Sequence, residues 1–363
     1  MTFETLIDTP ATAPQDPMDA SSDAGPRRRR LIVRIGRIAL ALLAGALAAL
    51  AHPPFGFLLG LVGYPLLMLL VERSESPRGA FWMGWLAGFA YFLIGCWWVG
   101  EAFLVNADQT WMAPFAVSLL PAGLGLFWGA AVALYWRFAP AGLARVLVFS
   151  ALFCLFEWLR GHVLTGFPWN PAGASWAAGS AASQFASVAG VYGLSLVTVT
   201  AVCAFAPLLA PGSRKRRIGM AVGGAVALAA LAIGGAAHLS RARLTYSDTL
   251  VRIVQADVAQ ESKWSPEAYR SIVDRYVNLT GRPGAAVPDV VIWPEGALPA
   301  SANTVFAEGS TDAVAISRAM QPGQTPADRA GAGRGVGGRG SLLQQPVRPV
   351  RRGRPRPESG GGL

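Results

Sequence analysis

One carboxylate in this sequence stands in a setting suited to proton transfer. Glu295 follows the segment Asp289–Trp293, in which three consecutive β-branched residues predict a short buried strand. Pro294 cannot donate to a neighbouring strand, so the strand is expected to end there, with Glu295 just beyond it. A carboxylate beside the large ring of Trp293 would be partly desolvated, which suits it to general acid or base chemistry. The alternative interpretation is a surface turn that contains a glutamate.

A second group of polar residues lies at the end of an apolar run. Glu157 and Arg160 are three residues apart, so they share one face of a helix and are able to pair. Glycines and prolines then end the helix, in a segment that carries Phe167 and Trp169. Arg160 is suited to hold a lipid phosphate while the aromatic residues lie over acyl chains. An ordinary interfacial anchor is the alternative.

The cysteines indicate no further site. Cys96, Cys154 and Cys203 all lie inside apolar runs, without the spacing of a disulfide framework or a metal site. Thiols in such runs are usually inert packing residues. We therefore expect neither a metal nor a cofactor.

The composition assigns the chain to the membrane. Of its 363 residues, 53% are hydrophobic and 14% are charged, whereas a soluble domain carries about 25% charged residues. The net charge of +10 comes almost wholly from arginine, since lysine occurs only at positions 215 and 263. Such a basic chain raises the question of nucleic-acid binding. The arginines form short clusters between apolar runs and in a tail, which favours membrane topology and argues against a nucleic-acid partner.

Apolar runs predict transmembrane helices along the first two thirds of the chain. We place seven of them at about residues 31–51, 57–71, 80–99, 111–136, 146–159, 182–209 and 218–238, with a tight turn at 52–56. The first run could be a signal peptide, because Ala-Leu-Ala occurs near its end. We favour an uncleaved helix, since the run spans about 20 residues and further spans follow.

The basic residues predict the orientation. They precede the first run and occupy the loops after the second, fourth and sixth runs, whereas the other loops carry only Arg160. The positive-inside rule therefore places the N-terminus in the cytoplasm and everything after residue 240 outside, in the periplasm of a bacterium.

The pattern changes after the last apolar run. Residues 250–255 and the segment before Glu295 predict strands, while 266–281 and 311–320 predict helices, the first of them capped by Ser265. This order is the beginning of an α/β domain. We therefore divide the chain into a disordered tail (1–30), a membrane domain (31–240), a partial α/β domain (245–320) and a disordered Arg/Gly/Pro-rich tail (321–363).

Together, several short motifs in this order resemble bacterial apolipoprotein N-acyltransferases. The motifs cover about residues 31–320 and lie at 53–56 (Pro-Pro-Phe-Gly), 97–99, 157–161, 164–169, 254–260, 263–264 and 293–295 (Trp-Pro-Glu). The resemblance implies a multi-span α-helical bundle in the inner membrane, followed by part of a periplasmic nitrilase-like domain, an α-β-β-α sandwich. It also implies acyl transfer from a phospholipid to the α-amine of a diacylated apolipoprotein.

The resemblance assigns roles to individual residues. The family uses a Glu, Lys and Cys triad, and Glu295 matches the catalytic Glu by its Trp-Pro-Glu context. Trp264 matches a tryptophan beside the site, and the lipid-binding role proposed for Glu157, Arg160, Phe167 and Trp169 fits the same family.

The sequence also departs from the family pattern. Gly296 stands where the family commonly has Ser, Thr or Asn. Lys263 precedes the Glu, and no Cys follows Cys203, so the other two members of the triad have no match. The residues after Met320 resemble the product of a shifted reading frame. We therefore expect residues 1–363 not to catalyse acyl transfer as written.

Two other functions fit parts of the sequence. A membrane protein that binds lipid without chemistry would keep the aromatic segment and dispense with the triad. A transporter would carry polar residues near the middle of its spans, and these runs are nearly free of charge there.

Overall fold

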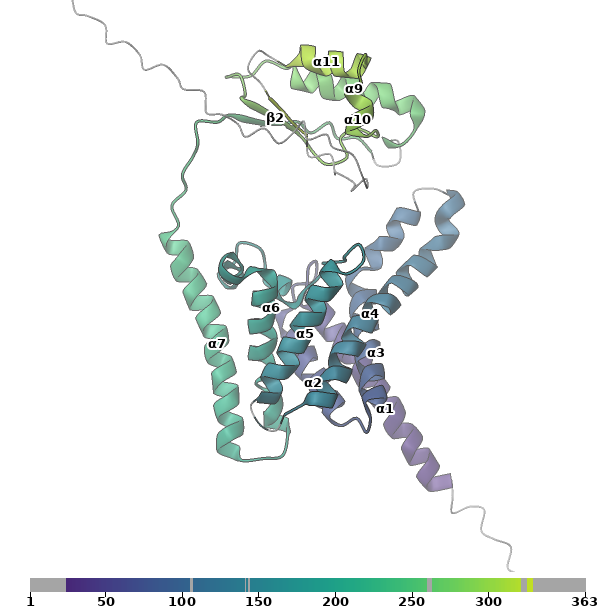
Figure 1. The fold of residues 1–363 in the computed structure, drawn as a ribbon, viewed down its shortest axis with the longest axis vertical. Coiled ribbons are helices and arrows are strands. Elements are labelled where there is room, and N and C mark those ends of the chain that lie inside the picture. The colour runs from purple at the N-terminus through teal and green to yellow at the C-terminus, as the bar shows by residue number, and fades with distance from the viewer. Residues whose placement is uncertain are drawn as a thin grey trace, which may run out of the picture. The chain divides into compact units, whose positions relative to one another are not determined.

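The computed structural model describes residues 24–104, 107–140, 142, 144–259, 263–320 and 325–328. The chain divides into two compact units, Met1–Leu244 and Thr245–Leu363 (Figure 1). Residues 1–23 and 329–363 of the two expected tails lie outside the described residues, as does Gln260 of the motif at 254–260.

The first unit is helical throughout its described residues. Its α-helices are α1 (Ala24–Leu50), α2 (Gly63–Glu72), α3 (Pro77–Gly95), α4 (Ala113–Phe138), α5 (Ala144–His162), α6 (Ala186–Cys203) and α7 (Arg214–Arg241). Short 3-10 helices connect them at η1 (Leu58–Val62), η2 (Trp97–Phe103), η3 (Ala107–Met112), η4 (Ala172–Ser175), η5 (Ala182–Phe185) and η6 (Ala206–Leu209). Each apolar run of the sequence coincides with one of the α-helices.

Not every helix is long and apolar enough to cross a membrane by itself. Among the described residues, four segments are long and apolar enough to do so, namely Arg28–Leu50, Ala107–Phe138, Ala182–Leu209 and Arg214–Arg241. A fifth results if Pro77–Gly95 and Trp97–Phe103, bent by 54°, count as one span. Leu58–Glu72 is a shorter apolar helix, and α5 contains Glu157 and Arg160. The long apolar helices support a membrane protein. The seven crossings expected from the sequence stay a prediction.

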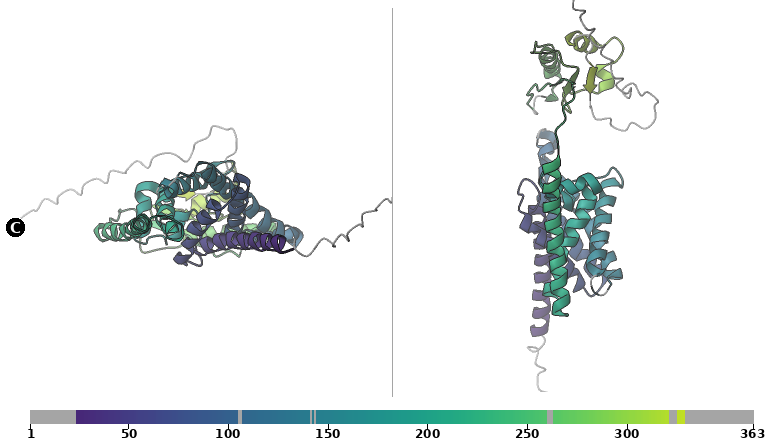
Figure 2. Two further views of the ribbon diagram at one scale, coloured as in Figure 1. Left: turned by 90° about the horizontal axis from the view of Figure 1, so that it is seen from below. Right: turned by 90° about the vertical axis from the view of Figure 1, so that its left-hand side faces the viewer.

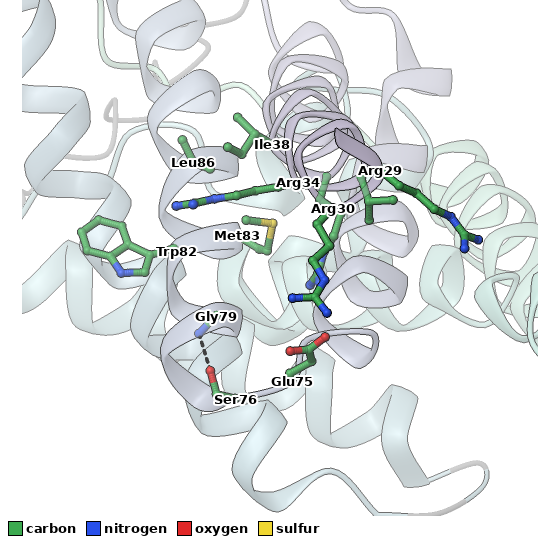
Figure 3. A pocket seen from close by; sticks show the side chains of 12 residues that line it. Arg29, Arg30, Arg34, Ile38, Glu75, Ser76, Gly79, Trp82, Met83 and Leu86 are labelled. Carbon is green, nitrogen blue, oxygen red and sulfur yellow. Dashed lines mark hydrogen bonds between the residues drawn. The ribbon is translucent and has the colours of Figure 1, made fainter. Parts of the chain in front are cut away.

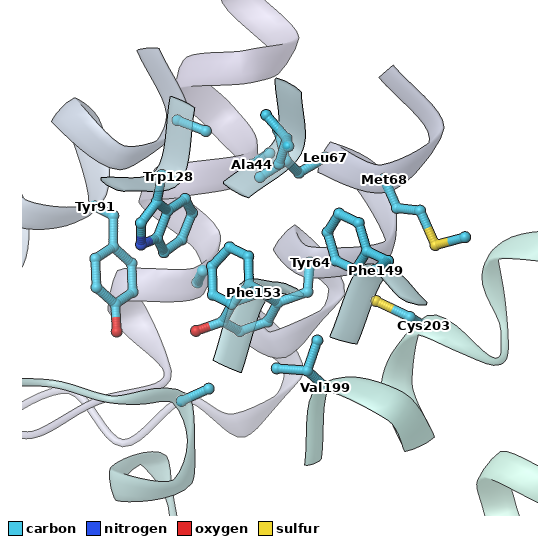
Figure 4. Close-up of a cluster of buried hydrophobic side chains, with 14 of the residues drawn as sticks. Ala44, Tyr64, Leu67, Met68, Tyr91, Trp128, Phe149, Phe153, Val199 and Cys203 are labelled. Atoms are coloured by element: carbon cyan, nitrogen blue, oxygen red, sulfur yellow. The ribbon is translucent and has the colours of Figure 1, made fainter. Parts of the chain in front are cut away.

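The core of the bundle combines small residues with large aromatic ones. A Cβ atom on Gly88 of α3 would lie 2.9 Å from the Gly125 Cα of α4, so the two backbones approach closely. Beside this contact, the rings of Trp128 and Phe153 meet edge to face with centroids 4.7 Å apart, and Tyr64 meets Phe153 at 5.3 Å (Figure 4). Aromatic packing therefore fills the space where α3, α4 and α5 are wider apart.

The basic loops of the bundle meet at one end. Arg37 of α1 donates to Ser74 in the loop after α2 (3.0 Å), and Trp136 of α4 donates to the Ser74 carbonyl (2.9 Å). Arg145 of α5 pairs with Glu72 of α2 at 3.3 Å. From this end α7 runs back along α6 at the edge of the bundle (Figure 2). The Arg216 guanidinium at the start of α7 lies against Gly142 in the loop after α4. The N-terminal segment and the three loops that the positive-inside argument grouped together thus lie on the same side of the bundle.

The second unit contains a small parallel sheet. Over its described residues the strand order is β1 (Val251–Ile253), β2 (Val290–Trp293), β3 (Thr325–Asp328), with Val251 opposite Val290 and Val290 opposite Thr325. The helix α9 (Pro266–Thr280) connects the first two strands, and α10 (Ala302–Val305) and α11 (Thr311–Ala319) follow. Ser265 caps α9 by accepting from the amide of Ala268, as its sequence position predicts.

This sheet is the start of an α/β arrangement and does not by itself identify a nitrilase-like sandwich. Val254, Ile272, Tyr276 and Val291 form the buried cluster between the sheet and α9. β3 lies beyond residue 320, the boundary expected from sequence. Its residues, Thr-Pro-Ala-Asp, have low strand propensity, which explains why no strand was expected there.

Candidate functional site

Glu295 occupies a tight turn directly after β2. The turn is closed by a hydrogen bond from the amide of Ala297 to the carbonyl of Pro294 (3.0 Å). Gly296 adopts φ +65°, a conformation that costs other residues energy, so glycine suits this position. The predicted position of Glu295, just past a strand end on a proline turn, is confirmed.

The expected desolvation of Glu295 by Trp293 is not found, and this expectation is corrected. The Trp293 indole turns toward α9, where it packs on Tyr276 with centroids 4.9 Å apart and donates to Thr280 (2.9 Å). The Glu295 side chain is exposed. The strand ends at Trp293, and the turn closed between Pro294 and Ala297 carries Glu295 out of the sheet, away from α9.

Lys263, which matches no member of the family's triad, lies beside this turn. A Cβ atom on Gly296 would be 2.9 Å from Lys263 Nζ, so the ammonium group lies against the backbone next to Glu295. The same ammonium lies 6.0 Å from the ring centroid of Trp264, which is itself exposed. Glu295, Lys263 and Trp264 therefore gather around one surface of the second unit. No local pattern in the sequence could have indicated Lys263, because α9 and β2 separate it from Glu295 along the chain.

In the first unit Arg160 is buried and holds the segment that follows its helix. Its side chain is 2% exposed. Arg160 Nη1 donates to the carbonyls of Phe167 and Trp169, the latter at 2.7 Å, and the amide of Phe167 donates to the Arg160 carbonyl at 2.8 Å. The guanidinium also lies over the ring of Phe92, 5.0 Å from its centroid. Arg160 thus fixes residues 164–173, which we call the aromatic loop.

Glu157, one helical turn earlier, holds the other end of the aromatic loop. Its Oε1 accepts from the amide of Ala172 at 2.8 Å, and Ser195 of α6 accepts from the amide of Gly173 at 2.8 Å. Glu157 is 3% exposed. No ion pair joins Glu157 to Arg160 in the described part of the chain, so the direct pairing allowed by their spacing is absent. Instead each side chain binds loop backbone.

The sequence analysis did not identify a third pair of residues that holds this loop. Tyr91 of α3 donates to the carbonyl of Asn170 (2.6 Å) and shares a 2.7 Å hydrogen bond with His52 Nε2. Both side chains are about 1% exposed. A tyrosine inside an apolar run and a histidine in the turn directly after another run are the sequence signal for them, since a buried polar side chain needs a partner.

The aromatic loop presents apolar side chains on the surface of the unit. The rings of Phe167 and Trp169 stack with centroids 5.2 Å apart, and Trp98 of η2 lies 6.1 Å from Trp169. Leu164 is 96% exposed. Leu164 and Asn170 have positive φ angles, 60° and 50°, which the buried contacts below the loop maintain.

The structure therefore forms two clusters from the predicted site residues. Glu157, Arg160, Phe167 and Trp169 belong to one cluster in the first unit, and Glu295 and Trp264 to another in the second unit. The described residues contain no group of three or more His, Cys, Asp and Glu side chains placed to hold a metal ion.

Comparison with known proteins shows which family the chain resembles. Residues 44–204 match the family described as "Apolipoprotein N-acyltransferase N-terminal domain". The chain is 50% identical over 291 residues to the apolipoprotein N-acyltransferase of Caulobacter vibrioides, covering 79% of this chain and 54% of that protein. It is 38% identical over 307 residues to the protein of the same name from Brucella melitensis, covering 79% of this chain and 56% of the relative.

A third relative, from Rhizobium leguminosarum bv. trifolii and also named apolipoprotein N-acyltransferase, is 40% identical over 285 residues, which are 72% of this chain and 52% of that protein. The chain spans about half the length of the curated relatives it matches. The residues that match the family's N-terminal domain include α3 to α5 and the aromatic loop. The chain is therefore similar to apolipoprotein N-acyltransferases over about half of their length, and its residues 44–204 match the N-terminal domain of that family.

Proposed function

We propose that this chain handles the lipid substrate in apolipoprotein N-acylation. The acyl donor is a phospholipid, and the acceptor is the α-amine of a diacylated apolipoprotein. The bundle lies in the bacterial inner membrane with the N-terminus in the cytoplasm. The second unit is part of a nitrilase-like domain in the periplasm. Similarity to this family supports this assignment.

The aromatic loop is the single observation that carries the proposal. It combines the exposed side chains of Leu164 and Trp169 with a backbone fixed from below by Glu157, Arg160 and Tyr91. A rigid apolar surface at the end of a helical bundle is suited to hold acyl chains with little loss of side-chain entropy. Arg160 Nε and Nη2 are buried and have no hydrogen-bond partner among the described residues. The proposal therefore gives Arg160 the role of fixing the loop backbone, while the exposed side chains of the loop contact the lipid.

In the second unit we propose Glu295 as general base, with Trp264 beside the substrate. Lys263 adds a positive charge at the same turn, where it would favour an ionised group and a developing oxyanion. The family's thioester chemistry needs a thiol as nucleophile. The last cysteine of the sequence is Cys203, in the first unit. The proposal therefore assigns lipid handling to this chain and leaves the covalent step without a nucleophile in residues 1–363.

Lipid photocrosslinking tests the role of the aromatic loop. A phospholipid with a diazirine in one acyl chain is incorporated into nanodiscs with the full chain, and crosslinked peptides are mapped by mass spectrometry. We expect crosslinks to residues 164–173 that fall severalfold in Trp169→Ala. Trp111→Ala removes another exposed tryptophan, in η3, and is the matched control. Equal crosslinking in Trp169→Ala and Trp111→Ala would return the loop to the role of an interfacial anchor.

Acyl transfer itself is tested in a strain depleted of its own enzyme. Residues 1–363 are expressed there, and a diacylated lipoprotein is analysed by mass spectrometry for a third acyl chain. We expect no triacylated product, because no thiol follows Cys203. Triacylated product that disappears on Glu295→Gln would contradict this expectation. Lipid crosslinking without acylation would identify a lipid-binding protein without chemistry.

A further inference from the structure

A groove of about 910 Å³ lies between the beginning of α1 and the beginning of α3. It is at the end of the bundle where the basic loops meet, as the contact between Arg37 and Ser74 shows. Figure 3 shows side chains of α1 on one side of it and side chains of α3, with the loop before α3, on the other. The groove lies entirely within the first unit.

The polar part of the groove is strongly basic. Arg29, Arg30, Arg34 and Arg37 line it, against one carboxylate, Glu75. Arg37 is bound to Ser74. The side chains of the other three arginines form no hydrogen bond or ion pair with any residue that the structure describes, and all three residues are exposed. Unpaired guanidinium groups that share a groove repel one another, and an anion between them removes that repulsion.

The rest of the groove is apolar. Its wall consists of Val33 and Ile38 on α1 and of Trp82, Met83 and Leu86 on α3. On α1 the apolar residues alternate with the arginines, and on α3 they follow Ser76 along the helix toward the middle of the bundle. Trp82 is 54% exposed, which is typical of a tryptophan at the level of lipid head groups. A soluble phosphate would use only the arginines, whereas a lipid would contact both parts of the groove.

Positive charge at this end of the bundle is expected in any case from the positive-inside rule, so charge alone does not indicate a site. The second basic cluster, Arg214–Arg217 at the start of α7, provides the contrast. Arg217 donates to the Ala210 carbonyl at 2.7 Å, and the Arg216 guanidinium lies against Gly142. Those two arginines are engaged with protein backbone, whereas Arg29, Arg30 and Arg34 face a groove with an apolar wall.

We propose that this groove binds an anionic phospholipid of the leaflet at the N-terminal end of α1. Arg30 and Arg34, with Arg29, hold the phosphodiester head group, and one acyl chain lies along Trp82, Met83 and Leu86. The lipid would link α1 to α3 along residues 28–36 of α1, which are exposed in the structure. The site differs from the aromatic loop, which follows α5 and is formed by other residues.

Native mass spectrometry of the full chain tests the proposal. The detergent-solubilised protein is titrated with phosphatidylglycerol or with phosphatidylcholine of the same acyl chains, and bound lipids are counted. Arg30→Gln/Arg34→Gln is the test variant. Arg214→Gln/Lys215→Gln removes the same charge from the same end of the bundle and is the matched control. Deacylated glycerophosphoglycerol is added as a competitor, to separate recognition of a lipid from recognition of a soluble phosphodiester.

We expect phosphatidylglycerol to bind more tightly than phosphatidylcholine and its affinity to fall by about tenfold or more in the test variant, since each arginine near a membrane surface contributes measurably. The control variant should stay within about twofold of the unchanged chain, because exposed charges farther from the bound head group than about 10 Å are screened by salt. An equal loss in both variants would reduce the site to general surface charge and overturn the proposal. Equal binding of the two lipids, or displacement by the deacylated head group, would also overturn it.

Discussion

Arg160 illustrates how far a single residue can be interpreted from sequence. Its place at the end of an apolar helix, one turn after Glu157, was predicted from the chain alone. Its partners were not, because they are carbonyl groups of Phe167 and Trp169, in a segment that turns back through positive φ angles. Spacing on a helix determines which side chains share a face, but it does not determine which of them bind the loop beyond.

The first prediction concerns the buried contacts of the aromatic loop. Arg160→Ala removes a buried guanidinium that donates to the carbonyls of Phe167 and Trp169. We expect this loss to lower the free energy of unfolding by about 3 kcal/mol. Residues 164–173 should also lose protection against hydrogen exchange in nanodiscs. Glu157→Gln is the comparison variant, since its amide oxygen can still accept from Ala172 and should preserve most of the protection. Unchanged exchange in Arg160→Ala would show that the loop is held by other contacts.

The second prediction concerns Tyr269 in α9. Burial, together with its hydrogen bond to Asp312 (2.7 Å) and the charge of that carboxylate, raises the pKa of Tyr269 to about 12. A pKa raised in the folded state stabilises the fold below the ordinary tyrosine pKa of about 10, and this contribution is lost as the pH rises through about 12. Contact between α9 and α11 should therefore weaken between these two pH values.

The measurement is phenolate absorbance of the full chain, with Tyr269→Phe to identify the contribution of this residue. Asp312→Asn removes the charge and should bring the pKa of Tyr269 closer to its ordinary value. Asp274→Asn is the control, because Asp274 lies 4.0 Å from Arg270, which also pairs with Asp312 at 2.9 Å. If the two asparagine variants titrate alike, the charge of Asp312 is not a cause of the shift.

At the scale of helices and strands, positions were predicted better than lengths. The apolar runs coincide with α1 to α7, and Ser265 with Pro266 begins α9 as expected. The run at 80–99 is bent between α3 and η2, at Cys96. Hydropathy does not register such a bend, since the residues on both sides are apolar. The packing around it involves Gly95, whose Cβ position lies 2.7 Å from Asn170 Nδ2 in the aromatic loop, a contact that is distant in sequence.

The third prediction concerns the contact between α3 and α4. A Cβ on Gly88 would lie 2.9 Å from both the Gly125 Cα and the Trp128 Cβ, so Gly88→Ala must push the helices apart. We expect a destabilisation of about 1–3 kcal/mol from this overpacking. Gly123→Ala is the control on α4, because nothing lies within 4 Å of its Cβ position. There alanine should be neutral or slightly stabilising, as its helix propensity exceeds that of glycine.

Thermal unfolding in detergent, followed by size-exclusion chromatography, distinguishes these two variants. Gly88→Ala should lower the temperature at which the monodisperse peak is lost, and Gly123→Ala should leave it within error or raise it. A similar temperature for both variants would mean that α3 and α4 can separate without cost.

At the scale of the whole chain, composition was the strongest guide. The low charge and long apolar runs indicated a membrane protein, and four helices of sufficient length and hydropathy support this. The α/β character of residues 245–320 followed from alternating strand and helix patterns. The parallel partner β3 could not be predicted, because its four residues carry neither β-branched nor aromatic periodicity beyond one threonine.

The last prediction concerns the orientation of the chain in the membrane. The basic loops meet at one end of the bundle through the contacts of Arg37, Trp136 and Arg145, so the positive-inside rule applies to that end as a whole. The prediction is that Ser213, before α7, faces the cytoplasm and Ser247, after α7, faces the periplasm; both are exposed.

Cysteine labelling tests this orientation in intact spheroplasts. The three native cysteines are first replaced by serine, and Ser213→Cys or Ser247→Cys is then introduced. A membrane-impermeant maleimide should modify the cysteine at 247 in intact cells and the cysteine at 213 only after lysis. The two positions lie on either side of one 28-residue helix, α7, which at 1.5 Å per residue is long enough to cross the hydrocarbon core of about 30 Å. The reverse pattern would invert the topology, and labelling of both positions in intact cells would show that α7 does not cross the membrane.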